Sequence, residues 1–347
     1  MESTANGCVP ARRPSLIVLG VVLFLASLSG LFYYKWGASL AKVDEIRSTG
    51  RWTTTAEALS AGGVWSGVLF YLKRVWIALV LGVLIATTVR TFVSARWVTG
   101  LLSRGGAARR QLAGGLAGAP LMLCSCCVTP IFSSVYEQGA RLGSALAVML
   151  AAPGFNLAAI VLTFLLFPLN LSLARLAGAL VAVLILPALL ERLFGASALS
   201  VRASKLTGAA TVDDLPRGAR EFVARFGRSL IYVTAVTVPF IVAGVALSAL
   251  LLPGLHALST GGAILATVAV GGFAVLIAVP TFFEIPLALL LLGAAQPGAA
   301  AAMLFAGPIV NLPSLFVLAR ETNARVSAAL AAGIWLIAIA CGVVVTL

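Results

Sequence analysis

The sequence Leu121-Met-Leu-Cys-Ser-Cys-Cys-Val-Thr-Pro130 places three thiols, Cys124, Cys126 and Cys127, inside an apolar segment. Only two other cysteines occur, one near each end of the chain. A single buried cysteine packs as a small hydrophobic residue, but three within four positions favour a site. Soft thiolates are typical ligands of soft metals and metalloids, and neighbouring thiols can cycle through a disulfide. Packing, ligation and redox chemistry are therefore three open interpretations of this cluster.

The composition is typical of a protein that crosses a membrane several times. Of the 347 residues, 61% are hydrophobic and 10% are charged, whereas a soluble domain has about 25% charged residues. The net charge of +13 fits cytoplasmic loops that face anionic lipid, so nucleic-acid binding is not indicated. We predict an all-α polytopic protein of a bacterial inner membrane, with about 7 to 10 membrane segments.

Four regions follow from the positions of the apolar and charged runs. They are an N-terminal helix with an interfacial loop (1–74), a first repeat with the cysteine cluster (75–193), a basic linker (194–228) and a second repeat (229–347). Because basic loops stay on the cytoplasmic side, we expect the N-terminus and the linker there.

The two repeats share the spacing of their proline, glycine and asparagine residues. Gly143 precedes Asn156 by 13 residues (156 − 143), and Gly298 precedes Asn311 by 13 (311 − 298). A proline stands three residues before each asparagine, and both repeats carry further helix-breaking residues upstream. The predicted helix breaks are Pro130, Pro153 and Gly154 in the first repeat, and Pro280, Pro286, Gly307 and Pro308 in the second.

The basic loops also decide the expected topology. If the loop 95–111, the linker and the loop between Arg320 and Arg325 all face the cytoplasm, an even number of crossings separates each pair. The cysteine region and the stretch 261–293 must then enter and leave the membrane on one side. The repeats would be inverted, with proline-broken or re-entrant helices that meet near the midplane, where secondary transporters build substrate sites.

Several elements resemble a known family. Cys-Ser-Cys-x-x-x-Pro at 124–130, Ala-Pro-x-x-Asn at 152–156 and Gly-Pro-x-x-Asn-x-Pro at 307–313 look like those of the predicted permease family that includes ArsP, the organoarsenical efflux permeases. The resemblance covers about residues 75–345. It implies export of trivalent methylated arsenicals or of other soft metals. This chain differs in having Cys127 where the pattern has a small residue, which keeps other thiophilic cargo open.

Carried over from that family, the three thiols fall on its thiol element, and Asn156 and Asn311 fall on its repeat asparagines. We expect these five residues to bind cargo, with the thiols as ligands of the metal or metalloid. The asparagine amides could instead satisfy backbone groups that the breaks leave unpaired. A free thiol, with a pKa of about 8.5, is mostly protonated at neutral pH, so ligation of a soft cation would release a proton. Glu284 is the candidate acceptor and coupling group, because an acid at membrane depth costs about 2.5–3.5 kcal/mol and is a functional candidate by default.

We therefore predict a permease rather than an enzyme, with a thiophilic metal or metalloid species as cargo. The sequence contains no GxxxxGK[ST] motif and no cofactor is expected, so an ion gradient, the cargo gradient or a partner protein would supply the energy. A membrane thiol oxidoreductase and an importer of small sulfur-containing solutes are the alternatives. Transport is favoured over oxidoreduction because an oxidoreductase has no need of duplicated proline-broken elements.

Overall fold

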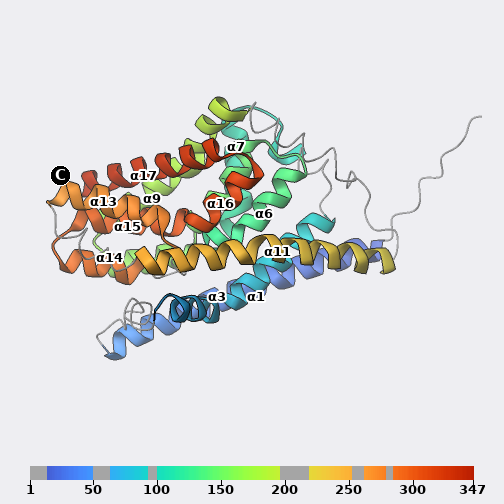
Figure 1. Cartoon of the computed structure of the whole chain (residues 1–347), viewed down its shortest axis with the longest axis horizontal. Helices are drawn as coiled ribbons and strands as arrows, with labels where there is room; N and C mark the ends of the chain where they lie inside the picture. Colours follow the sequence, from blue (N-terminus) through green and yellow to red (C-terminus); the bar gives the residue numbers. More distant parts are fainter. Residues whose placement is uncertain (1–13, 50–62, 93–99, 196–218, 252–261, 279–283) are drawn as a thin grey trace, which may run out of the picture.

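Every regular element in the part of the chain that the computed structural model describes is a helix (Figure 1), which confirms the all-α prediction. The described residues are 14–49, 63–92, 100–195, 219–251, 262–278 and 284–347. The first half contains α1 (Pro14–Thr49), α3 (Gly63–Phe92), α5 (Ala107–Gly118), the 3-10 turn η1 (Ala119–Leu121), α6 (Ser125–Glu137), α7 (Leu142–Gly154), α8 (Leu157–Leu166) and α9 (Leu169–Leu184). The second half contains α11 (Ala219–Leu251), α13 (Ala263–Leu276), α14 (Glu284–Gly293), α15 (Pro297–Ile309), α16 (Leu312–Glu321) and α17 (Ala324–Thr346).

Three long helices, α1, α3 and α11, pack along one side of the molecule (Figure 1). The shorter helices form the remaining bundle, in which α7 contacts α5, α6 and α9, and α15 contacts α13, α14 and α17. Helices are the expected form for these apolar runs because a lipid environment offers no hydrogen bonds to an unpaired backbone. The α3 helix has 30 residues, or about 45 Å at 1.5 Å per residue, which exceeds the ~30 Å of a bilayer core.

By length and composition, two helices in the described residues can cross a membrane. They are Leu169–Gly195, which continues α9, and Ala324–Thr346, which is α17. Two bent pairs would each add one span: α7 with α8, bent by 44°, and α15 with α16, bent by 46°. The chain is therefore a multi-pass membrane protein, while the full count of about 7 to 10 segments remains a prediction.

The two halves have the same order of elements. In the first half, α5 and α6 precede the bent pair α7–α8 and the long helix α9; in the second half, α13 and α14 precede α15–α16 and α17. The helices α5, α6, α13 and α14 have 12, 13, 14 and 10 residues, so each is about 15–21 Å long. None of these four helices can cross a ~30 Å core alone, as a re-entrant element requires. The inversion of the halves about the midplane remains a prediction.

The predicted break at Pro130 is wrong in position. Pro130 lies inside α6, and the chain breaks upstream of it, where Met122 has a left-handed backbone (φ 49°) and Cys124 is extended. Proline removes the N–H that would bond to the carbonyl four residues earlier, which here belongs to Cys126. The Thr129 hydroxyl donates to that carbonyl at 2.6 Å. Because the carbonyl keeps a partner, the helix continues through the proline.

The two bent pairs break immediately after the predicted prolines. Pro153 and Gly154 are the last two residues of α7, and α8 begins after Asn156. Pro308 is the penultimate residue of α15, and α16 begins after Asn311. A proline near the end of a helix interrupts the hydrogen-bond ladder, so the second helix of each pair can start in a new direction.

The remaining predicted break residues have other positions. Pro286 is the third residue of α14, where the missing N–H is one that a helix start leaves unpaired anyway, so it does not interrupt the helix. Gly307 lies within α15, and a Cβ added there would lie 3.4 Å from the Glu284 Cβ. This part of α15 therefore lies beside the start of α14, at a distance that would give an added Cβ ordinary van der Waals contact. Pro280 lies outside the described residues.

Candidate functional site

The three thiols lie together at the start of α6. Cys124 is the N-cap residue, with φ −73° and ψ 163°, while Cys126 and Cys127 belong to the first turn. Their sulfur atoms are separated by 2.9 Å (Cys124 to Cys127), 3.2 Å (Cys124 to Cys126) and 3.9 Å (Cys126 to Cys127). All three side chains are at least 95% buried. One metal or metalloid atom could therefore contact all three sulfurs if the sulfurs moved slightly apart.

The start of a helix is also a favourable place for negative charge on sulfur. Backbone N–H groups of the first turn and the helix dipole attract anions there. Metal or metalloid ligation uses the thiolate form of cysteine, so this position offsets charge that develops on the sulfurs during ligation. The break before α6 thus creates both the cluster and its electrostatic environment.

Asn156 and Gly82 are neighbours of the turn that carries the thiols. The Asn156 amide nitrogen donates to the carbonyl of Met122 at 3.4 Å, and its oxygen accepts from the Ala159 N–H at 3.4 Å. A Cβ added to Gly82 of α3 would lie 3.2 Å from the Cys127 carbonyl oxygen. Asn156 therefore links the α7–α8 bend to the thiol turn, and Gly82 gives α3 room to approach it.

Asn311 caps the second bent pair. Its side-chain oxygen accepts from the Ser314 N–H at 3.2 Å, and the Asn311 N–H donates to the Ser314 hydroxyl at 3.0 Å. This reciprocal capping box satisfies two donors that the helix start leaves unpaired. The side chains of both repeat asparagines thus form hydrogen bonds with backbone groups at a bend. This structural role is the alternative to cargo binding.

We expect Asn311→Ala to destabilise the protein by about 1 kcal/mol, because the cap to Ser314 is lost. Asn311→Ser should retain most of the stability, since serine is also a good N-cap residue. Thermal unfolding of the purified protein in detergent measures both variants. Equal stability of the alanine variant and the parent would contradict the capping role.

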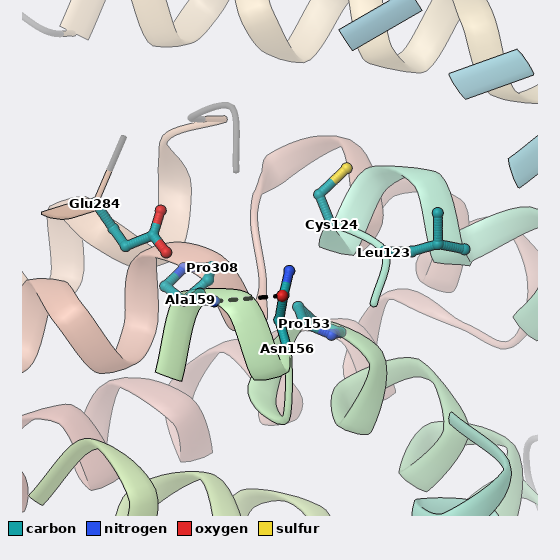
Figure 2. Close-up of a pocket in the computed structure, with 7 residues that line it drawn as sticks. All are labelled: Leu123, Cys124, Pro153, Asn156, Ala159, Glu284 and Pro308. Carbon is teal, nitrogen blue, oxygen red and sulfur yellow. Dashed lines mark hydrogen bonds between the residues drawn. The ribbon is translucent and has the colours of Figure 1, made fainter. Parts of the chain in front are cut away.

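A small cavity connects residues of both halves. Its volume is about 10 Å³, room for roughly one water molecule. Figure 2 shows Glu284 on one flank and Cys124 with Leu123 on the other, with Asn156 and the two bend prolines between them. The lining residues are Leu123, Cys124, Pro153, Asn156, Ala159, Glu284 and Pro308.

The cavity brings together only some of the predicted site residues. Cys126 and Cys127 contact Cys124 through sulfur but do not line the cavity, and Asn311 does not line it either. Gly154 of the first bend lies near the second bend, since a Cβ added there would lie 3.8 Å from Ile309. The two bends and the thiol turn therefore meet in one place, from both halves of the chain.

Arg175 was not among the residues predicted from the sequence. It lies within α9, and its Nη2 contacts the Glu284 Oε1 at 3.3 Å, with the two side chains 4% and 0% exposed. Its Nη1 donates to the Thr163 hydroxyl at 2.7 Å. An arginine inside an apolar run is a signal in itself, because a charge at membrane depth marks a functional candidate by default.

The spacing of Cys124 and Cys127 is a further signal in the sequence. The two residues form a Cys-x-x-Cys pair, and their sulfurs have the shortest separation in the cluster, 2.9 Å. Cys-x-x-Cys pairs at helix starts are typical of thiol redox motifs. Redox chemistry therefore has a specific structural argument in addition to the number of thiols.

Comparisons with known proteins agree with the resemblance seen in the sequence. The family model described as predicted permease, of the ArsP type, matches residues 67–347. The chain is also similar to UPF0718 protein YraQ of Escherichia coli (strain K12), with 28% identity over 335 residues that cover 93% of this chain and 92% of that protein. No solved structure matches the chain. Because the family model matches more than half of the chain, the chain belongs to the predicted permease family.

Proposed function

We propose that this permease exports a thiophilic metal or metalloid species from the cell and binds it at Cys124, Cys126 and Cys127. The observation that supports the proposal most is the cluster itself, three buried sulfurs within 3.9 Å of one another at a helix break. Soft sulfur ligands select soft metals and metalloids over harder ions. A trivalent organoarsenical is the cargo that the family resemblance favours.

The proposed route runs between the two halves, which we take to be inverted repeats. Transporters of that kind bind substrate at discontinuous helices near the midplane, and here both bends reach one cavity with Cys124. A cavity of about 10 Å³ has room for roughly one water, so it is too small for cargo. We therefore take this to be a closed arrangement, from which transport requires the halves to separate at this point.

The chemistry of ligation distinguishes the two classes of cargo. A soft cation that replaces the proton of each thiol releases those protons to the surroundings. A trivalent arsenic hydroxide behaves differently: an arsenic–sulfur bond forms, an arsenic–oxygen bond breaks, and the thiol proton leaves with the hydroxide as water. No net proton is then released.

We expect cadmium to acidify a weakly buffered solution of the purified permease, and methylarsenite to bind without acidifying it. An indicator dye measures the proton release, and equilibrium dialysis measures binding. The matched control is a variant in which all three thiols of the cluster are replaced by serine, which should show neither binding nor acidification. The same acidification by cadmium in that variant would contradict thiol ligation.

Growth of a metal-sensitive host that expresses the permease tests the function directly. We expect resistance to at least one of arsenite, methylarsenite, antimony, copper, zinc and mercury, and accumulation of that species in inverted membrane vesicles. Accumulation only in right-side-out vesicles would instead support import. Unchanged sensitivity to every species would contradict the proposal.

The Cys124–Cys127 pair supports a second candidate function, a membrane thiol oxidoreductase. Formation of a disulfide between these residues would release two protons and pass two electrons to an acceptor such as a quinone. Differential alkylation with mass spectrometry, on membranes incubated with and without a quinone, measures the redox state. Quinone-dependent oxidation of the pair, without any change in metal resistance, would favour this second function.

We also propose that the basic segments 194–228 and 95–111 lie on the cytoplasmic side, because both are rich in arginine and lysine. Reporter fusions at Ser200 and Gly105 should then report the same side of the inner membrane. Opposite sides would contradict the re-entrant arrangement of the cysteine region, since an odd number of crossings would separate the two segments.

A further inference from the structure

A buried ion pair joins the two halves of the permease next to the cavity. Arg175 of α9 contacts Glu284, the first residue of α14, at 3.3 Å, and both side chains are almost fully buried. The same guanidinium donates to the Thr163 hydroxyl of α8 at 2.7 Å. Arg175 therefore connects α8 and α9 of the first half with α14 of the second half.

The pair is not the arrangement expected if its role were only to stabilise the fold. A buried ion pair is often no more stabilising than well-packed apolar residues of similar volume. Arginine and carboxylate bind most strongly through two parallel hydrogen bonds, but here only the Oε1 of Glu284 accepts from Arg175. Among the residues that the structure describes, none forms a hydrogen bond with the second oxygen, Oε2, which is also buried. A single contact of this kind is easier to separate than a bidentate one.

The pair also lies where moving parts would have to separate. The Thr163 hydroxyl that receives the Arg175 hydrogen bond donates in turn to the Ala159 carbonyl of α8 at 2.7 Å. Glu284 also lies near Gly307 of α15, since a Cβ added to that glycine would lie 3.4 Å from the Glu284 Cβ. Glu284 therefore lies beside the second bent pair, whose Pro308 lines the same cavity, and through Arg175 it is linked to the first.

We propose that the Arg175–Glu284 pair is a latch between the two halves: it holds them in the closed arrangement, and transport requires the pair to separate. Arg175 is then a positioning residue, because it acts through Glu284 and not on the cargo. The latch rests on one part of the proposed function, namely that the permease moves between closed and open arrangements. It does not depend on which species is carried.

The test measures how fast a membrane-impermeant maleimide modifies the buried thiols, without any cargo. The experiments use full-length protein in a Cys8→Ser, Cys341→Ser background, so that only Cys124, Cys126 and Cys127 can react. Right-side-out and inverted vesicles expose the two faces of the membrane separately. We expect Arg175→Gln to increase the modification rate at least about tenfold from one face, since about 1.4 kcal/mol of lost closing free energy shifts an opening equilibrium tenfold.

Three companion variants separate a latch from a general loss of structure. Arg175→Lys retains the positive charge and should react at close to the parental rate. Glu284→Gln should behave like Arg175→Gln. The double variant should react no faster than either single one, because both remove the same interaction. General loosening would instead raise the rate from both faces, which would contradict the latch.

Two further results would overturn the proposal. One is a parental modification rate in both glutamine variants when they are folded, as judged by size-exclusion chromatography. The other is additive rates in the double variant, which would mean that the two residues act independently. If no metal or metalloid is transported but the glutamine variants react faster from one face, the latch stands and the proposed cargo is wrong.

Discussion

Replacing Cys124 or Cys126 by serine should abolish the metal or metalloid resistance proposed for the permease. Each substitution removes one of three sulfurs that lie within 3.9 Å of one another, and a serine hydroxyl is a hard ligand that binds soft species poorly. Loss of a group that merely orients a ligand already lowers metal affinity about 10–100-fold, so loss of a ligand should cost at least as much. Growth inhibition and vesicle uptake measure the effect.

Cys341→Ser provides the matched control. Cys341 is also buried, but it lies in α17 and donates to the Ala174 carbonyl at 3.4 Å, away from the cluster. Serine can keep that hydrogen bond, so transport should be unchanged; the same is expected for Cys8→Ser, although Cys8 lies outside the described residues. Equal activity of all four variants would remove thiol ligation and favour simple packing of the cysteines.

Glu284→Gln should retain cargo binding but lose the response of transport to a proton gradient. Glutamine has nearly the same size as glutamate but cannot exchange a proton, and Glu284 lines the same cavity as Cys124. Protonation of the carboxylate would weaken its attraction to Arg175 and so favour the open arrangement. Uptake into inverted vesicles, with and without an imposed proton gradient, measures the coupling.

Arg175→Lys is the informative comparison for that experiment, because it alters the partner of Glu284 but leaves the carboxylate able to exchange a proton. It should retain a response to the gradient. If Glu284→Gln responds to the gradient as strongly as the parent does, Glu284 is not the coupling group. Movement driven by the cargo gradient or by a partner protein would then explain the energy supply.

The sequence predicted those features that depend on composition and local pattern. Long apolar runs predict helices because lipid leaves the backbone no other partner, and prolines three residues before Asn156 and Asn311 predicted where the bent pairs break. A small side-chain contact overturned the prediction at Pro130. Whether a helix stops at a proline depends on whether a neighbour such as Thr129 satisfies the freed carbonyl, and such a contact has no simple sequence signature.

The ion pair of the site could not be predicted because its two residues are 109 positions apart. Glu284 was identifiable as a charge in an apolar stretch, and Arg175 carried the same signal in α9. Only the packing of the two halves shows that these charges neutralise each other. The second role of Asn156, its contact with the Met122 carbonyl, is likewise a product of tertiary structure.

X-ray absorption at the arsenic edge of methylarsenite bound to the purified permease tests the central claim most directly, because it identifies the atoms bonded to the cargo. We predict sulfur in the first coordination shell of arsenic for the parent and for Cys341→Ser, and loss of that sulfur when Cys124 and Cys126 are both replaced by serine. A first shell of oxygen and carbon alone in the parent, or a sulfur shell that persists in the double serine variant, would contradict binding at the thiol cluster.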